Sequence, residues 1–283
     1  MHARLFVVRS RSAALAAAAL LSGLVSDAAL AGTLTVKGSD TMVQLVQRWA
    51  HGFARGLPGT RVQVTGGGSG VGLAALENGG TELAASSRPI TEAERARLRA
   101  QWGSEPVEHV VARDAVTFYV HASNPVGPLT VEQLAAIYLG DVTNWRELGG
   151  ADAPIVVYSR EGTSGTYAFV KERLLHGQDF TVRAQLLPGT AAVVNAVAED
   201  PHGIGYGGAA FARGVRVVEL DTPRGPVPPS EATVGSGDYP LARELYLYRR
   251  APGTADARAF VGWVLSEPGQ QLVAAAGFFP VRP

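Results

Sequence analysis

Three loops that combine glycine with hydroxyl side chains each follow a predicted strand and open a predicted helix. They are Gly38-Ser39-Asp40-Thr41, Gly68-Ser69-Gly70 and Thr163-Ser164-Gly165-Thr166. A helix N-terminus has unpaired backbone N–H groups and a partial positive charge, so it attracts anions. Glycine lets a ligand approach the backbone, and hydroxyls donate further hydrogen bonds. Each loop alone could be an ordinary helix cap, but the three together favour a shared anion site.

The pattern of apolar residues around these loops predicts an α/β fold. Predicted strands at 33–36, 61–65, 82–85 and 155–158 alternate with predicted helices. Met42, Leu45, Val46, Trp49 and Phe53 recur at helical spacing, and Thr91 with Glu94 forms a capping box for a helix running to about residue 100. Such alternation is typical of mainly parallel sheets, in which ligands bind beyond the carboxyl ends of the strands.

Two arginines follow predicted strands at the same edge. A guanidinium group can bind two oxygens of a tetrahedral anion at once, so Arg88 and Arg160 are candidate ligands. The alternative for each is a surface ion pair, for example with Glu92 or Glu161. Pro89 directly after Arg88 could also turn that side chain away from the site.

The first 31 residues have the composition of an export signal. Arg4, Arg9 and Arg11 precede an apolar run at 13–25, and Ala29-Leu30-Ala31 matches a signal-peptidase site. An uncleaved N-terminal anchor is the alternative. Cleavage would leave 32–283 in the periplasm, and no cysteine follows that could carry a lipid. Residues 32–283 have 22 basic and 24 acidic side chains, a balance that is not typical of a nucleic-acid or membrane-surface binder.

Motifs for catalysis or cofactor binding are weak or missing. The six histidines are scattered without metal-ligand spacing, so neither a metal nor another cofactor is expected. No G-x-S-x-G or P-loop motif is present, which makes a phosphatase the less favoured alternative. Residues 70–75 match a dinucleotide-binding G-x-G-x-x-A pattern, but the predicted helix there is too short for that role.

Seven stretches, spread over nearly the whole chain after residue 31, resemble one known family. They are Lys37-Gly38-Ser39-Asp40-Thr41-Met42, Gly66-Gly67-Gly68-Ser69-Gly70, Ala85-Ser86-Ser87-Arg88-Pro89, Asn144-Trp145, Ser159-Arg160-Glu161-Gly162-Thr163-Ser164-Gly165-Thr166, Gly203-Ile204-Gly205-Tyr206 and Tyr239-Pro240-Leu241. Together they are similar to the phosphate-binding protein of bacterial phosphate ABC transporters.

This resemblance implies a type II periplasmic solute-binding protein with two α/β lobes joined by two crossing strands. One lobe would contain 32–115 and 240–283, and the other 116–239. Inorganic phosphate would lie in the cleft between the lobes, and the closed protein would deliver it to the permease of an ABC transporter. The resemblance implies these phosphate ligands: Ser39, Thr41, Ser69, Ser87, Arg88, Arg160, Ser164, Gly165 and Thr166.

One position departs from part of that family. Some members have an aspartate where Ser87 stands, and its carboxylate accepts the proton that phosphate carries near neutral pH and sulfate does not. A hydroxyl can also accept a hydrogen bond from that proton, and Asp40 could contribute. The sequence therefore leaves open a sulfate-like oxyanion as the ligand. It also leaves open a phosphate-sensing or adhesion role for the same fold. We expect a monomer, because no extended apolar stripe suggests self-association.

Overall fold

Eleven strands and nine α-helices alternate along the described part of the chain. The computed structural model describes residues 2, 32–56 and 60–281, so the predicted signal peptide lies outside the described residues except for His2. The strands are β1 (Thr33–Gly38), β2 (Arg61–Thr65), β3 (Leu83–Ser86), β4 (Val107–His121), β5 (Val156–Arg160), β6 (Gln185–Leu187), β7 (Gly203–Gly208), β8 (Val215–Val218), β9 (Leu220–Thr222), β10 (Gly225–Val227) and β11 (Ala242–Arg249). The α-helices are α1 (Val43–Gly56), α2 (Ser69–Glu77), α3 (Glu92–Trp102), α4 (Val131–Leu139), α5 (Gly165–Arg173), α6 (Thr190–Glu199), α7 (Glu231–Ser236), α8 (Ala255–Val264) and α9 (Glu267–Ala275).

One mixed sheet contains most of the strands, in the order β2-β1-β3-β11-β4-β7-β5-β6, with β8 also paired to β4. Strands β2, β1 and β3 are mutually parallel, as are β7, β5 and β6. Between these groups, β11 and β4 pair antiparallel to each other and to their outer neighbours. The predicted α/β class and the parallel strand groups are confirmed.

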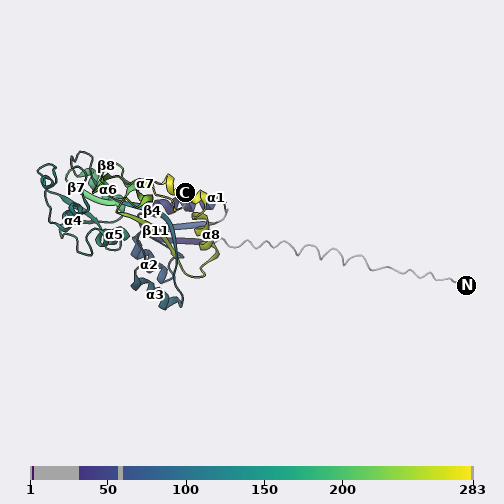
Figure 1. Cartoon of the computed structure of the whole chain (residues 1–283). Helices are drawn as coiled ribbons and strands as arrows, with labels where there is room; N and C mark the ends of the chain where they lie inside the picture. Colours follow the sequence, from purple (N-terminus) through teal and green to yellow (C-terminus); the bar gives the residue numbers. More distant parts are fainter. Residues whose placement is uncertain (1, 3–31, 57–59, 282–283) are drawn as a thin grey trace. The chain divides into compact units, whose positions relative to one another are not determined.

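Two large apolar cores lie along β4 and β11. The first contains side chains of β1, α1, α8 and α9 together with Val111 and Leu245. The second contains side chains of α4, β5 and β7 together with Phe118 and Leu241. In Figure 1, β4 and β11 lie between the elements of the two cores. The same two long strands therefore pass from one core into the other.

Buried aromatic residues anchor helices in each core. The indole N–H of Trp49, on the predicted apolar face of α1, donates to the carbonyl oxygen of Gly269 at 2.9 Å. In the second core, the indole of Trp145 donates to the carbonyl oxygen of His202, also at 2.9 Å. Each ring thus buries its apolar surface without leaving its N–H unpaired.

The capping box of α3 is confirmed, because Thr91 and Glu94 bond reciprocally to each other's backbone N–H. The segment 221–237 has the proline- and glycine-rich composition typical of a surface loop, but it contains most of the antiparallel pair β9–β10 and the short helix α7. Ser230 caps α7 with a second capping box formed with Thr233. Proline and glycine are turn signals, so the sequence pattern of this segment does not indicate its short regular elements. In the described part of the chain, no helix has both the length and the apolar composition needed to cross a membrane.

Candidate anion-binding site

Buried hydroxyl groups from four segments meet near the ends of β1, β3 and β5. The Oγ1 atoms of Thr41 and Thr166 lie 3.1 Å apart, although 125 positions separate them in the chain. The Oγ atoms of Ser69 and Ser87 lie 3.4 Å apart, and the backbone N–H of Ser87 donates to Ser69 Oγ at 3.0 Å. We call these four residues the hydroxyl cluster; each is at most 1% exposed.

Helix starts bring these hydroxyls together. Ser69 is the first residue of α2, and Thr166 is the second residue of α5. The hydroxyl of Ser164 caps α5 by accepting from the backbone N–H groups of Thr166 and Tyr167, both at 3.2 Å. Two helix N-termini therefore face the cluster, and their partial positive charge favours an anion there.

Gly165 lets the two helix starts approach each other. A Cβ atom at this position would lie 2.2 Å from Ser69 Oγ and 2.6 Å from Ser87 Oγ. Any side chain on residue 165 would therefore displace the hydroxyls of the cluster. The second close approach is at Gly68, whose Cβ would lie 2.5 Å from the carbonyl oxygen of Thr163.

Arg160 ends β5 and is 1% exposed. Its Nε and Nη2 atoms donate to the two carboxylate oxygens of Glu161 at 3.1 and 2.8 Å. Its Nη1 donates to Thr190 Oγ1 at 2.9 Å, and its Nη2 to Asp40 Oδ2 at 2.8 Å. These four hydrogen bonds within the described chain leave one of the five guanidinium N–H groups for a ligand.

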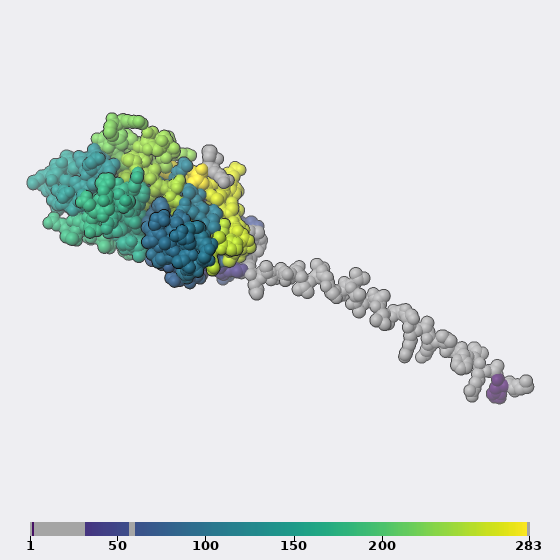
Figure 2. Space-filling view, turned by 60° about the horizontal axis from the view of Figure 1, so that its bottom comes forward, coloured from purple at the N-terminus to yellow at the C-terminus, as the bar shows by residue number. Residues whose placement is uncertain are grey.

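Contacts between the elements of the two cores surround the cluster. The Asp40–Arg160 ion pair joins the loop after β1 to the end of β5. The backbone N–H of Gly70 donates to the carbonyl oxygen of Thr163 at 3.0 Å. In Figure 2, the blue segment that includes α2 and α3 packs directly against the teal-green segment that includes α5. The cluster is therefore enclosed by elements of both cores.

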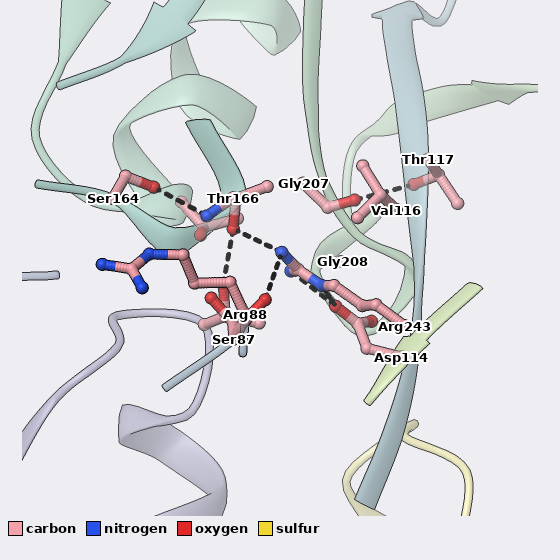
Figure 3. A network of polar contacts seen from close by, with 12 residues as sticks. Ser87, Arg88, Asp114, Val116, Thr117, Ser164, Thr166, Gly207, Gly208 and Arg243 are labelled. Atoms are coloured by element: carbon pink, nitrogen blue, oxygen red, sulfur yellow. Dashed lines mark hydrogen bonds and ion pairs between the residues drawn. The ribbon is translucent and has the colours of Figure 1, made fainter. Parts of the chain in front are cut away.

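Arg88 is the predicted site residue whose charged group the structure does not bring into the cluster. Its guanidinium makes two hydrogen bonds to Glu94, at 2.8 and 2.7 Å, and a third to the carbonyl oxygen of Pro89 at 2.9 Å. Figure 3 shows this guanidinium pointing away from the guanidinium of Arg243. Arg88 therefore forms an ion pair, the alternative to its role as an anion ligand, and the partner is Glu94.

Ser39 and Asp40 are held at the end of β1. The backbone N–H of Ser39 donates to the carbonyl oxygen of Ala85 on β3 at 2.8 Å, and Ser39 is 2% exposed. Among the described residues, no hydrogen bond joins its hydroxyl to the cluster. Asp40 Oδ1 accepts from the backbone N–H of Gly67 at 2.9 Å, which fixes this carboxylate beside Arg160.

Arg243 of β11 also reaches the cluster, although it lies outside the sequence motifs that predicted the site. Its Nη1 donates to Thr166 Oγ1 at 3.1 Å and to the carbonyl oxygen of Ser87 at 3.2 Å (Figure 3). Its Nε and Nη2 donate to Asp114 Oδ2 at 3.0 and 2.7 Å. Burial raises the pKa of Asp114 above its usual value, despite the adjacent guanidinium. Opposite charges within two largely apolar strands were the sequence signal that could have found this pair.

The alternative chemistries find no support in this geometry. Residues 70–75, which match a dinucleotide pattern, lie inside α2 and do not form a loop before a helix. Within 32–56 and 60–281, no three histidine or carboxylate side chains are grouped as a metal site would require. The cluster is instead rich in hydroxyl and guanidinium donors, which suit an oxyanion.

Comparisons with known proteins agree with this fold. The PBP superfamily domain matches residues 25–268. The chain is 33% identical to the phosphate-binding protein PstS of Pseudomonas aeruginosa, over 99% of this chain and 94% of that one. It is 29% identical to PstS of Bacillus subtilis, over 88% of this chain and 81% of that one.

A solved structure is similar over a comparable length. It is a candidate phosphate ABC transporter substrate-binding protein with bound phosphate from Clostridium perfringens, with a TM-score of 0.82 and 28% identity. The match covers 89% of this chain and 100% of that chain. The chain belongs to the PBP superfamily and, within it, to the family of the phosphate-binding proteins PstS.

Proposed function

We propose that this protein captures inorganic phosphate in the hydroxyl cluster and delivers it to an ABC transporter in the inner membrane. The observation that carries the proposal is the set of buried hydroxyls at the starts of α2 and α5, beside a buried arginine. Relatives over the whole length of the chain are named phosphate-binding proteins and not enzymes, which supports binding without catalysis.

The hydrogen bonds around the cluster favour donation to a ligand. Ser69 Oγ accepts from the N–H of Ser87, and Thr166 Oγ1 accepts from Arg243. Each of these hydroxyls has one hydrogen, which remains for donation once a lone pair is occupied. A phosphate dianion can accept hydrogen bonds from these hydroxyls in place of the neighbouring hydroxyl oxygens. The proposed ligands are Thr41, Ser69, Ser87, Arg160, Gly165 and Thr166, with Ser39 and Ser164 holding the loops.

Ser87 is the proposed acceptor of the phosphate proton. Among the described residues, no backbone or arginine N–H donates to its Oγ, whose hydrogen-bond partner is Ser69 Oγ at 3.4 Å. Its lone pairs are therefore available to a ligand that carries a proton. Phosphate has such a proton near neutral pH and sulfate lacks one, so this assignment favours phosphate over sulfate.

The presence of two cores supports a division into two lobes, 32–115 with 240–283 and 116–239, connected by β4 and β11. An anion that contacts both lobes binds the closed arrangement better and shifts the population toward it. We further propose that residues 1–31 direct export, that the protein works in the periplasm as a monomer, and that the permease recognises the closed form.

Calorimetry tests the proposal. The purified protein is unfolded and refolded to remove bound anions, then titrated with phosphate and, separately, with sulfate. Binding of phosphate at micromolar concentration or tighter, about −8 kcal/mol, with loss of binding in Arg160→Ala, is the expected result. A preference for sulfate would keep the site and change the ligand. No heat with either anion would reject the oxyanion site.

A further inference from the structure

Arg243 and Asp114 form a buried ion pair between β11 and β4. The two residues are direct cross-strand partners in the sheet, and they are 7% and 1% exposed. The desolvation of two buried charges can exceed their mutual attraction, so a pair of apolar residues would often serve stability equally well. Stability alone therefore gives no sufficient reason for this pair, and its other contacts become informative.

Those other contacts lead into the hydroxyl cluster. Arg243 comes from a strand that passes between the cores, and its Nη1 atom reaches Ser87 after β3 and Thr166 in α5. The guanidinium also lies over the ring of Phe169, 5.5 Å from its centroid, which restricts its position further. The Arg243 side chain thus connects β11 both to Ser87 and to Thr166 of the hydroxyl cluster.

The direction of the hydrogen bond to Thr166 matters for binding. A guanidinium group has no acceptor, so Arg243 must donate to Thr166 Oγ1 and occupy one of its lone pairs. The hydrogen of Thr166 is then left for Thr41 Oγ1, 3.1 Å away, or for an anion. Replacing Arg243 would free the Thr166 hydroxyl to rotate and to act as an acceptor, which would repel an oxyanion.

Asp114 holds this guanidinium by one carboxylate oxygen. Both hydrogen bonds that Arg243 donates to this carboxylate go to Oδ2, and Oδ1 makes no hydrogen bond of normal geometry to the described residues. Arg160 is likewise paired with carboxylates, those of Asp40 and Glu161, whereas Glu94 holds the guanidinium of Arg88 away from the cluster. Among the described residues, Arg243 is the arginine whose guanidinium contacts Ser87.

We propose that Arg243, held by Asp114, is a positioning and specificity-determining residue of the anion site, which fixes the Thr166 hydroxyl as a donor and supplies positive charge beside Ser87. The inference rests on the proposed binding of an oxyanion in the hydroxyl cluster. It assigns the recognition of the anion's charge to two arginines, Arg160 and Arg243.

Phosphate titration of anion-stripped variants tests this assignment. Arg243→Gln is expected to weaken phosphate binding at least about tenfold, because a hydrogen bond from a charged group and its charge are lost together. Arg243→Lys should recover part of that loss, since an ammonium group still donates to Thr166 Oγ1. Arg216→Gln is the matched control: Arg216 is half-buried and donates to the carbonyl oxygens of Asn124 and Val126, away from the cluster.

A double variant separates positioning from folding. Asp114→Leu combined with Arg243→Met removes both charges, so no charge is left buried without its partner. The double variant is expected to keep the wild-type melting temperature within a few degrees and to bind phosphate at least about tenfold more weakly. Wild-type affinity in either the folded double variant or a folded Arg243→Gln protein would overturn the inference. If the wild-type protein itself bound no phosphate, the proposed function would fail, which is a distinct result.

Discussion

Arg160 Nη2 and Asp40 Oδ2 lie 2.8 Å apart, although Asp40 follows the first strand of one core and Arg160 ends a strand of the other. The pair is mostly buried, with 2% of the arginine side chain and 20% of the aspartate side chain exposed. Because Asp40 also accepts from the backbone of Gly67, it fixes the guanidinium relative to the glycine-rich loop before α2.

Arg160→Lys tests whether phosphate binding depends on the geometry of this guanidinium or only on its positive charge. A lysine keeps the charge but cannot bond Asp40, Glu161 and Thr190 from separate nitrogen atoms. We expect phosphate affinity to fall about 10- to 100-fold, the range for lost hydrogen bonds to a charged group. Calorimetry measures it, with the exposed Arg146→Lys as control. Equal affinities of the two variants would contradict the role given to Arg160.

Gly165→Ala tests the close approach of α5 to α2. The new methyl group would lie 2.2 Å from Ser69 Oγ and force that hydroxyl to move. We expect phosphate affinity to fall at least about tenfold with little loss of thermal stability, because alanine suits a helix better than glycine. Gly162→Ala is the matched control, since a Cβ there meets no atom within 4 Å. Unchanged binding in Gly165→Ala would place the anion elsewhere.

Ser87→Ala tests the proposed proton acceptor. Removing this hydroxyl takes away a donor for any oxyanion and the acceptor for the proton of phosphate. We therefore expect weaker phosphate binding, by about tenfold, and a smaller preference for phosphate over sulfate. Parallel titrations with both anions give the ratio. Ser86→Ala is the control, because the Ser86 hydroxyl donates to the carbonyl oxygen of Arg88 outside the cluster. An unchanged ratio of phosphate to sulfate affinity in Ser87→Ala would contradict the assignment of Ser87 as the acceptor.

Arg88 and Glu94 are expected to affect stability in acid but not binding. Burial raises the pKa of Glu94, but the hydrogen bonds from Arg88 and Thr91 outweigh it, so the pKa lies below the usual 4.5. A lowered carboxylate pKa contributes stability that is present above pH 4.5 and lost as the pH falls through the folded-state pKa. Glu94→Gln should cost about 1 kcal/mol near neutral pH and less at pH 3.

Denaturant unfolding at several pH values measures this difference, with the exposed Glu219→Gln as control for the substitution itself. Phosphate affinity of Arg88→Gln should stay within about twofold of wild type, since its guanidinium faces Glu94. A tenfold loss of phosphate affinity in Arg88→Gln would instead indicate that Arg88 contributes to anion binding.

Local patterns in the sequence predicted the local structure well. The apolar spacing from Leu45 to Phe53 gave the buried face of α1, and the capping box gave the start of α3. The glycine and hydroxyl loops do open α2 and α5. These features depend on neighbours within one or two helical turns, so the sequence alone contains the required information.

The misassigned and missed features depend on distant partners. Whether Arg88 turns toward the cluster or toward Glu94 is decided by the packing of α3. Arg243 and Asp114 are 129 positions apart and meet only because β11 pairs with β4. No local sequence pattern indicates such a pairing. The last stretch that resembles the family ends at Leu241, just before Arg243.

The crystal structure of the anion-stripped protein after addition of phosphate tests the central claim most directly. We predict a single tetrahedral anion whose oxygens lie about 2.7–3.2 Å from the hydroxyls of Ser69 and Thr166 and from a guanidinium nitrogen of Arg160. The Oγ1 atoms of Thr41 and Thr166, now 3.1 Å apart, would then bond the anion instead of each other. A phosphate found elsewhere, with Thr41 still bonded to Thr166 and Ser69 to Ser87, would contradict the account.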